Sequence, residues 1–247
     1  MCTVTYLPLK SGFIITSNRD ERLLRKTATA PQVVSNGKAK ILFPRDGEAG
    51  GTWIATAENG RTVCLLNGAF VPHHHQPPYR KSRGLVVLDF FETNSVFDFK
   101  EQYNLQGIEP FTMLVVEDKK LYELRWDGNG KYFKALEETK PQILCSVTLY
   151  TDKVITMRQQ WFADWLKTHA EYTIAEILRF HLFAGEGDLA TQIRMSRAGI
   201  VQTVSITCVQ QQADKLRMYY SDVQGDKDFY FGAYSFSKES EGLSISA

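Results

Sequence analysis

The pattern of apolar and polar positions predicts strands towards both ends of the chain and helices between them. Short apolar runs rich in β-branched residues, separated by Gly, Asn-Gly and Asp-Gly turns, are typical of antiparallel strands. The predicted strands cover residues 2–9, 13–17, 39–43, 51–57, 61–66, 111–117, 121–126, 142–149, 201–209, 216–220 and 229–234. Apolar residues at helical spacing predict helices over 82–92, 152–167 and 173–183, and polar stretches containing proline predict loops over 18–38 and 71–79.

The first two strands form a hairpin that returns charged residues to the start of the chain. A two-residue turn at positions 10 and 11 pairs Leu9 with Gly12. The same register predicts that Cys2 lies opposite Arg19, and Asp20 follows directly. A thiol, a guanidinium and a carboxylate are therefore expected at one end of this hairpin.

The order of the elements indicates the fold class. Strands, then helices, then strands again differ from the regular strand–helix alternation of a parallel sheet. We therefore predict an α+β fold with two antiparallel sheets flanked by helices. The sequence has no internal repeat, low-complexity linker or compositional break, so the chain is interpreted as a single domain over residues 1–247, with a loose tail over 238–247.

Composition narrows the classes of function. Lys plus Arg total 29 and Asp plus Glu total 28, a balance that disfavours nucleic acid and anionic membranes as partners. The four cysteines are widely spaced, which disfavours zinc and a disulfide framework and fits a reducing compartment. Neither a signal-like segment nor a run of about 18 apolar residues is present. We expect a cytoplasmic protein that acts on a small molecule.

Position 2 carries the most informative chemistry. Removal of Met1 would make Cys2 the first residue, with a thiol and a free amine on the same residue. A nearby guanidinium such as Arg19 favours the thiolate over a thiol with an ordinary pKa of about 8.5. The α-amine, with a pKa of about 8, is then the general base, and Asp20 would orient it. The alternative is an inert terminal cysteine beside an ordinary solvated Asn-Arg-Asp-Glu turn.

Other polar motifs carry weaker signals. Asn67, where an apolar run meets Gly68, would stabilise an oxyanion through its amide or backbone N–H, and the alternative is a plain Asn-Gly turn. Consecutive histidines at 73–75 do not project towards one point, so a solvated loop is favoured over a metal site. The sequence contains neither a P-loop nor a dinucleotide-binding glycine motif, and no cofactor is predicted.

Eight motifs spread over nearly the whole chain together resemble one family. They are MCT at 1–3, TSNRDE at 16–21, GGTWI at 50–54, LLNG at 65–68, PPYRKSRG at 77–84, LRWDG at 124–128, SVTLY at 146–150 and TVSIT at 203–207. The combination resembles the NRDE family, also called the transport-and-Golgi-organisation family. This resemblance implies an N-terminal nucleophile hydrolase-like sandwich of four layers, αββα, with a more distant similarity to penicillin V acylases and bile salt hydrolases.

The resemblance also implies site residues. The acylase group uses a terminal Cys, an Arg and an Asp after the first hairpin, and an Asn after a later strand. These match Cys2, Arg19, Asp20 and Asn67. The family relatives are linked to secretory organisation, lipid metabolism and haem handling, so the alternative function is a non-catalytic carrier of a small hydrophobic ligand or of haem ligated by the terminal Cys.

This sequence departs from the acylase pattern at two places. The acylases have a second oxyanion Asn, for which this chain offers Ser146 or Thr148, with Asn18 as a further candidate. A later Arg of the acylases has Arg197 as its nearest counterpart.

Overall fold

The computed structural model describes residues 3–197, 199–224, 228–237 and 240–246. The chain divides into two compact units. The first unit contains residues 1–25, 140–145 and 150–247, and the second contains residues 26–139 and 146–149. Each unit is an antiparallel sheet with two helices, so the predicted α+β class with two antiparallel sheets and flanking helices is confirmed.

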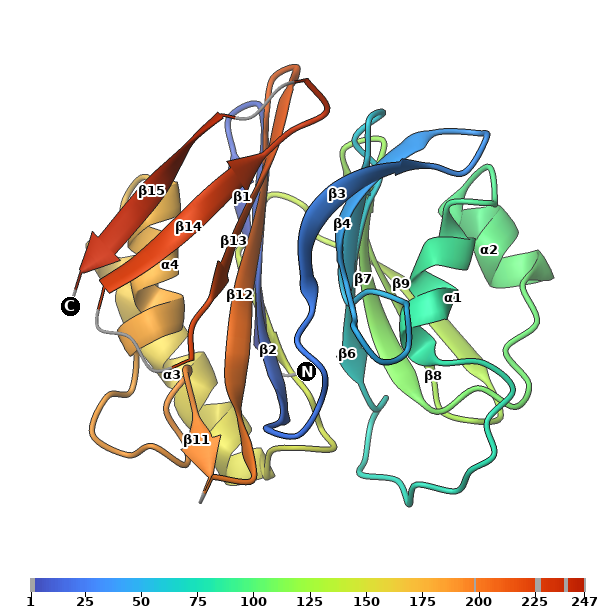
Figure 1. Ribbon diagram of the computed structural model, residues 1–247, viewed down its shortest axis with the longest axis horizontal. Helices are drawn as coiled ribbons and strands as arrows, with labels where there is room; N and C mark the ends of the chain where they lie inside the picture. The colour runs from blue at the N-terminus through green and yellow to red at the C-terminus, as the bar shows by residue number, and fades with distance from the viewer. Residues whose placement is uncertain (1–2, 198, 225–227, 238–239, 247) are drawn as a thin grey trace. The chain divides into compact units, whose positions relative to one another are not determined.

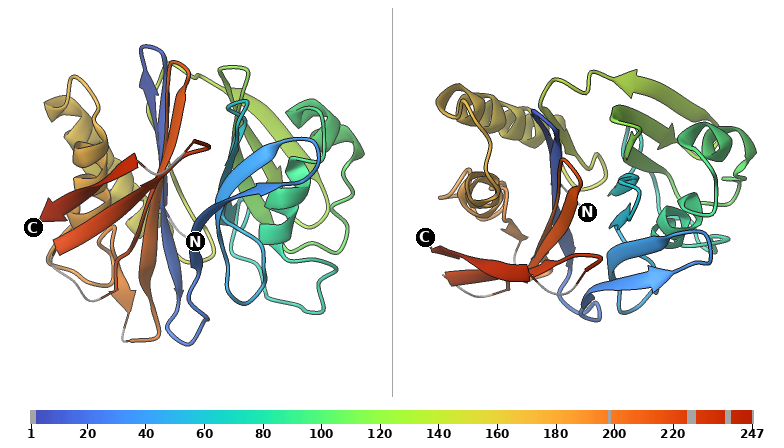
Figure 2. Two further views of the ribbon diagram at one scale, coloured as in Figure 1. Left: turned by 45° about the horizontal axis from the view of Figure 1, so that its top comes forward. Right: turned by 90° about the horizontal axis from the view of Figure 1, so that it is seen from above.

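The first unit is built on a sheet in which the hairpin β1–β2 is paired with a neighbouring strand on each side (Figure 1). The strand order is β10-β1-β2-β12-β13-β14-β15, and β11 pairs with β12. The bounds are β1 Thr3–Leu9, β2 Gly12–Arg22, β10 Gln142–Cys145, β11 Ser196–Arg197, β12 Val201–Gln212, β13 Lys215–Asp222, β14 Asp228–Tyr234 and β15 Ser240–Ser246. Helices α3, Asp152–Thr168, and α4, Ile174–Phe183, lie along one face of this sheet (Figure 2).

The helices of the first unit cover an apolar sheet face. Leu7, Ile14 and Ile206 of the sheet share one buried cluster with Ile177 and Phe180 of α4. Burial of a side chain of this size stabilises the fold by about 1.5–3 kcal/mol. The predicted capping box at the start of α4 is present, because the side chain of Thr173 binds the Glu176 amide and the Glu176 carboxylate binds the Thr173 amide.

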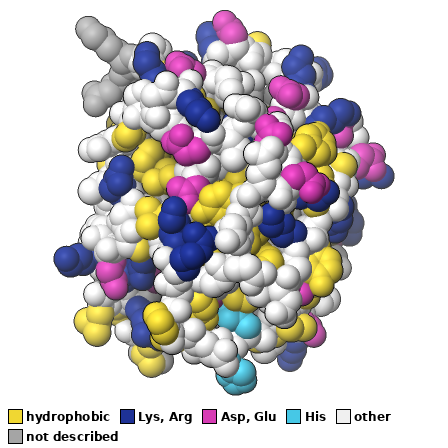
Figure 3. All heavy atoms as spheres, turned by 90° about the vertical axis from the view of Figure 1, so that its right-hand side faces the viewer, with side chains coloured by type: hydrophobic (Ala, Val, Ile, Leu, Met, Phe, Trp, Pro, Cys, Tyr) yellow, Lys and Arg dark blue, Asp and Glu magenta, His cyan; other side chains and the backbone are white. Residues whose placement is uncertain are grey.

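The second unit follows the same plan with consecutive strands. Its sheet order is β3-β4-β5-β6-β7-β8-β9. The bounds are β3 Thr29–Ser35, β4 Lys40–Arg45, β5 Ile54–Ala57, β6 Thr62–Asn67, β7 Phe111–Glu117, β8 Lys120–Trp126 and β9 Lys131–Leu136. Helices α1, Arg83–Phe90, and α2, Val96–Gln102, belong to this unit. On the face shown in Figure 3, Lys and Arg side chains are interspersed with Asp and Glu, as is typical of a solvated face.

The structure confirms the predicted hairpin register, because Leu9 pairs with Gly12 and Thr3 pairs with Asn18. Other predictions are wrong. Residues 18–38 are not a loop, since β2 continues to Arg22 and β3 follows. The predicted strand at 142–149 ends at Cys145.

Several short elements were missed by the sequence pattern. The loose tail predicted over 238–247 is wrong for Ser240–Ser246, which pairs with β14 as β15. Strand β9 and helix α2 were not predicted. In the described residues, no helix has both the length and the apolar character needed to span a bilayer.

Candidate functional site

Three consecutive candidate residues lie on β2, which is hydrogen-bonded between β1 and β12. Asn18, Arg19 and Asp20 are all buried. Thr3 is the partner of Asn18, while Cys2 itself lies outside the described residues. A strand paired on both sides holds its backbone rigidly, so this part of β2 presents these polar side chains with little freedom.

The Asp20 carboxylate is fixed by two hydroxyl groups. Tyr150, just before α3, donates a hydrogen bond to Oδ2, and the Oγ1 of Thr203 donates to Oδ1 at 2.6 Å. The Thr203 hydroxyl in turn accepts from the backbone N–H of Met195 at 3.0 Å. Burial and the neighbouring Asp20 charge raise the pKa of Tyr150 well above its usual value, so the phenol remains a donor. Sequence reasoning found Asp20 but neither of its partners.

Arg158 of α3 is a fully buried guanidinium that sequence reasoning also missed. Its Nη1 donates to Thr3 Oγ1 at 2.5 Å, and its guanidinium carbon lies 3.8 Å from the centre of the Tyr150 ring. Its Nε and Nη2 donate to the carbonyls of Thr191 and Gln192, at 3.1 and 2.5 Å. The available signal was its position on the buried stripe of α3, four residues from each of the other two members of that stripe, Val154 and Phe162.

Cys145 lies at the edge of this group, opposite Thr3 on β10. Its Sγ is 3.8 Å from Thr3 Oγ1. Burial raises the pKa of the Cys145 thiol, and the positive charge of Arg158 offsets part of that rise. Cys145 therefore has the environment of an inert, protonated thiol rather than of a nucleophile.

Asn18 is engaged on the helix-covered side of the sheet. Its Nδ2 donates to the carbonyls of His181 and Ile193 at 3.2 and 3.1 Å, and its Oδ1 accepts from His181 Nδ1 at 2.5 Å. His181 Nε2 accepts from Thr5 Oγ1 at 2.7 Å. Burial, with the charge of Arg158, lowers the pKa of His181 to about 3, so the ring is neutral. With both polar atoms engaged, Asn18 is a structural clamp between β2 and α4.

Arg19 points away from this clamp, because successive strand residues face opposite sides of a sheet. It pairs with Ser205 of β12, and its charge partly offsets the rise that burial causes in the pKa of Tyr220. The hydroxyl of Thr207, two residues from Ser205 on β12, is buried with no hydrogen-bond partner in the part of the chain that the structure describes. A buried face that carries a guanidinium and an unsatisfied hydroxyl is costly and marks a candidate binding surface.

The second unit carries the Asn67 site at the end of β6. The backbone carbonyl of Asn67 accepts from Ser146 Oγ at 2.8 Å, and Ser146 Oγ lies 3.0 Å from Thr148 Oγ1. By contrast, the buried side-chain Oδ1 of Asn67 has no partner among the described residues. Gly68 has a φ of +82°, and a Cβ there would lie 2.7 Å from methyl carbons of Val147 and Thr148.

Each unit therefore contains one group of candidate residues. Arg197 lies near the Asp20 group, since its guanidinium carbon is 5.2 Å from the Tyr150 ring centre and its Nε donates to Ala190 O at 3.1 Å. In the second unit, Asn67, Ser146 and Thr148 form one connected set.

The loop predicted to be solvated makes specific contacts with Glu109 through two of its histidines. The rings of His73 and His75 each lie 3.1 Å from the same oxygen of Glu109, and Arg83 lies 3.0 Å from its other oxygen. The described residues contain no cluster of three His, Cys, Asp or Glu side chains arranged to hold a metal ion.

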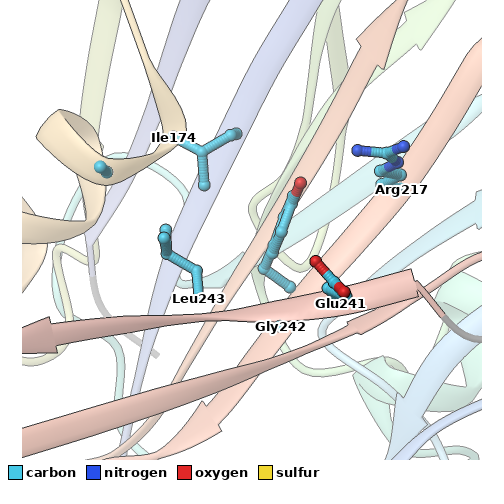
Figure 4. Close-up of a pocket in the computed structure, with 7 residues that line it drawn as sticks. Ile174, Arg217, Glu241, Gly242 and Leu243 are labelled. Atoms are coloured by element: carbon cyan, nitrogen blue, oxygen red, sulfur yellow. The ribbon is translucent and has the colours of Figure 1, made fainter.

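A cavity of about 480 Å³ opens elsewhere in the first unit, beside the start of α4 (Figure 4). Ile174 and Leu243 supply apolar wall, and the charged Arg217 and Glu241 also line it. None of the candidate residues named above lines this cavity.

Comparison with known proteins places the chain in a family. The family model described as Transport and Golgi organisation 2 matches residues 1–220. The chain belongs to this family. No curated protein is matched by sequence.

Solved structures extend the comparison to fold. Two variants of a conjugated bile acid hydrolase from Clostridium perfringens match with TM-scores of 0.58 and 0.59, at 12% identity, over 100% of this chain and 97% of theirs. A Caenorhabditis elegans orthologue of N-acylethanolamine-hydrolyzing acid amidase matches with a TM-score of 0.56, at 12% identity, over 84% of this chain and 92% of that one. The fold is thus that of the N-terminal nucleophile hydrolases.

Proposed function

We propose that this member of the Transport and Golgi organisation 2 family is an amide hydrolase whose nucleophile is Cys2. The observation that carries the proposal is the register of the first hairpin. Thr3 is paired with Asn18, Cys2 precedes Thr3 in the sequence, and the buried Arg19 follows Asn18. Continuation of this register would place Cys2 opposite Arg19. A guanidinium beside a thiol favours the thiolate, which is the nucleophilic form.

The proposed reaction is acyl transfer through a thioester. The α-amine of a processed Cys2 takes the thiol proton, and the sulfur attacks the amide carbonyl carbon. The C–N bond then breaks as the ammonium returns the proton to the leaving amine. Water attacks the thioester, the C–S bond breaks, and the products are a carboxylic acid, the amine and the regenerated thiol. Asn67, at the end of β6, is the proposed donor to the oxyanion through its side-chain amide N–H or its backbone N–H.

The substrate class follows from the structural neighbours only as a proposal. One neighbour is named for hydrolysis of conjugated bile acids and the other for hydrolysis of N-acylethanolamines. The second name describes an amide between an acyl group and ethanolamine, a small polar amine. We propose the same bond type for this chain.

The first test is chemical and needs no substrate. Intact-mass spectrometry before and after a limiting dose of iodoacetamide, with the labelled residue mapped and the rate followed against pH, reports both Met1 removal and thiol reactivity. The proposal expects a chain that starts at Cys2, with that thiol alkylated faster than Cys64, Cys145 and Cys208. Retained Met1, or a Cys2 with an ordinary thiol pKa, rejects the hydrolase and favours a non-catalytic carrier of a small hydrophobic ligand or of haem.

The second test is catalytic. A panel of N-acyl amines with bile acid and fatty acyl groups is incubated with the wild-type chain and with Cys2→Ala. Cys208→Ala is the matched control, since this thiol is buried and burial raises its pKa to about 12. Release of amine by the wild type and Cys208→Ala, but not by Cys2→Ala, is the expected result.

A further inference from the structure

Among the described residues, the buried guanidinium of Arg158 is hydrogen-bonded only to neutral groups. Its hydrogen bonds go to one hydroxyl and two backbone carbonyls, and an aromatic ring lies against it. Among the described residues, no carboxylate forms an ion pair with it. Burying a charge without a counter-ion is costly, and well-packed apolar residues often replace buried charges without loss of stability. Stability alone therefore gives a weak reason for an arginine at this position.

The contacts of Arg158 converge on the start of the chain by two routes. The first route is direct, because Nη1 binds the hydroxyl of Thr3, the residue that follows Cys2. The second runs through Tyr150, whose ring lies under the guanidinium and whose hydroxyl donates to Asp20, the residue that follows Arg19. Each route ends one residue from the proposed nucleophile or from its proposed activator.

We propose that Arg158 is a positioning residue that sets the reactivity of Cys2 by fixing Thr3 and, through Tyr150, the carboxylate of Asp20. The inference rests on the proposed function. Arg158 does not touch substrate in this role. It supplies a buried positive charge near the start of the chain and holds both routes in one geometry, since the planar fork of an arginine donates in several fixed directions at once.

Two isosteric variants cut the routes one at a time. Thr3→Val removes the hydroxyl that Arg158 binds and keeps the side-chain shape. Tyr150→Phe keeps the ring under the guanidinium and removes the donor to Asp20. Arg158→Gln cuts both routes, and Arg158→Lys keeps the charge but not the fork. Arg179→Gln is the control, because this arginine lies on α4 and binds the Ser246 carbonyl, outside both routes.

The readout is the rate of Cys2 alkylation by iodoacetamide against pH, with cooperative unfolding as the check on folding. For Arg158→Gln we expect the apparent thiol pKa of Cys2 to rise by about one unit, which lowers the thiolate fraction near neutral pH about tenfold. Each single-route variant is expected to lower the rate by a smaller factor, Arg158→Lys to recover part of the loss, and Arg179→Gln to match the wild type.

The outcomes separate this inference from the function on which it rests. An ordinary Cys2 in the wild-type chain overturns both. A reactive wild-type Cys2 whose pH profile is unchanged in folded Arg158→Gln overturns the positioning role alone. Should Arg158→Gln fail to fold, Thr3→Val and Tyr150→Phe decide, and unchanged profiles in both overturn the inference. A lowered rate in both variants supports it.

Discussion

Asn18 of the first unit and Asn67 of the second have opposite surroundings. Each is a candidate residue on a strand of an antiparallel sheet. The side chain of Asn18 makes hydrogen bonds to His181 and to two backbone carbonyls, whereas the buried Oδ1 of Asn67 has no partner among the described residues. A satisfied buried amide stabilises a fold, and an unsatisfied one costs free energy and is retained for another reason. The comparison favours a structural role for Asn18 and keeps Asn67 as the residue proposed for chemistry.

The largest expected effect is the loss of the Asn18 clamp. Asn18→Ala leaves His181 Nδ1 and two carbonyls without their partners, at a cost of about 3 kcal/mol or more. Asn67→Ala removes no hydrogen bond of the described structure and is expected to cost less than about 1 kcal/mol. Urea unfolding of both variants measures the difference. Equal destabilisation would erase the contrast between the two asparagines.

Turnover of an amide substrate tests Asn67 by its effect on activity, where the preceding prediction compared effects on stability. If Asn67 stabilises the oxyanion, Asn67→Ala lowers kcat by about 10²–10³, the usual loss for one oxyanion donor.

Gly68 tests how tightly the Asn67 loop is held. Gly68→Ala introduces a Cβ at a φ of +82° that would lie 2.7 Å from Val147 and Thr148 methyl carbons, and we expect a loss of about 3 kcal/mol. Gly37→Ala is the matched control, because its φ is +87° and no atom lies within 4 Å of the added Cβ. The control isolates the backbone strain, about 1 kcal/mol. Equal losses of stability in Gly68→Ala and Gly37→Ala would show that the loop after Asn67 can move to accommodate the added Cβ.

A pair of threonines on β12 repeats the contrast between satisfied and unsatisfied groups. Thr203→Val removes the donor to Asp20 and the acceptor of the Met195 N–H, and is expected to cost about 2 kcal/mol. Thr207→Val removes a buried hydroxyl without a described partner, so its stability is expected to stay within about 1 kcal/mol of the wild type or to rise. Thermal unfolding compares them. A strongly destabilised Thr207→Val contradicts the interpretation of an unsatisfied group.

The last prediction is a pH dependence from His181, which is measured as a slope and not as a single loss of stability. Its pKa in the folded state is about 3, below the ordinary value of 6.5. Between these values the unfolded state binds one more proton than the folded state, so this group lowers stability as pH falls below about 6.5, by roughly 1 kcal/mol per pH unit. His181→Gln should flatten the slope of unfolding free energy between pH 6 and 4. His74→Gln, on an exposed loop, should leave that slope unchanged.

Sequence reasoning found Arg19 and Asp20 but placed them in a loop, and it missed Arg158 and Tyr150. Arg19 and Asp20 are predictable because a two-residue turn fixes the hairpin register, and that register is confirmed. Arg158 and Tyr150 lie 155 residues from Thr3 and 130 residues from Asp20, respectively, and local patterns carry no information about such partners. An arginine on the buried stripe of α3 was the one local sign available.

The elements that could be predicted from the sequence are those whose own residues show a pattern of buried apolar positions or a capping motif. Central strands and the capped helix α4 carry apolar periodicity or capping residues that act within a few positions. The missed strands β3, β9 and β15 all lie at sheet edges, where few side chains are buried and where Pro31 of β3 is tolerated. Only the tertiary structure decides such edges, because their pairing depends on the neighbouring strand. It likewise decides which buried polar groups find partners, because those partners come from distant parts of the chain.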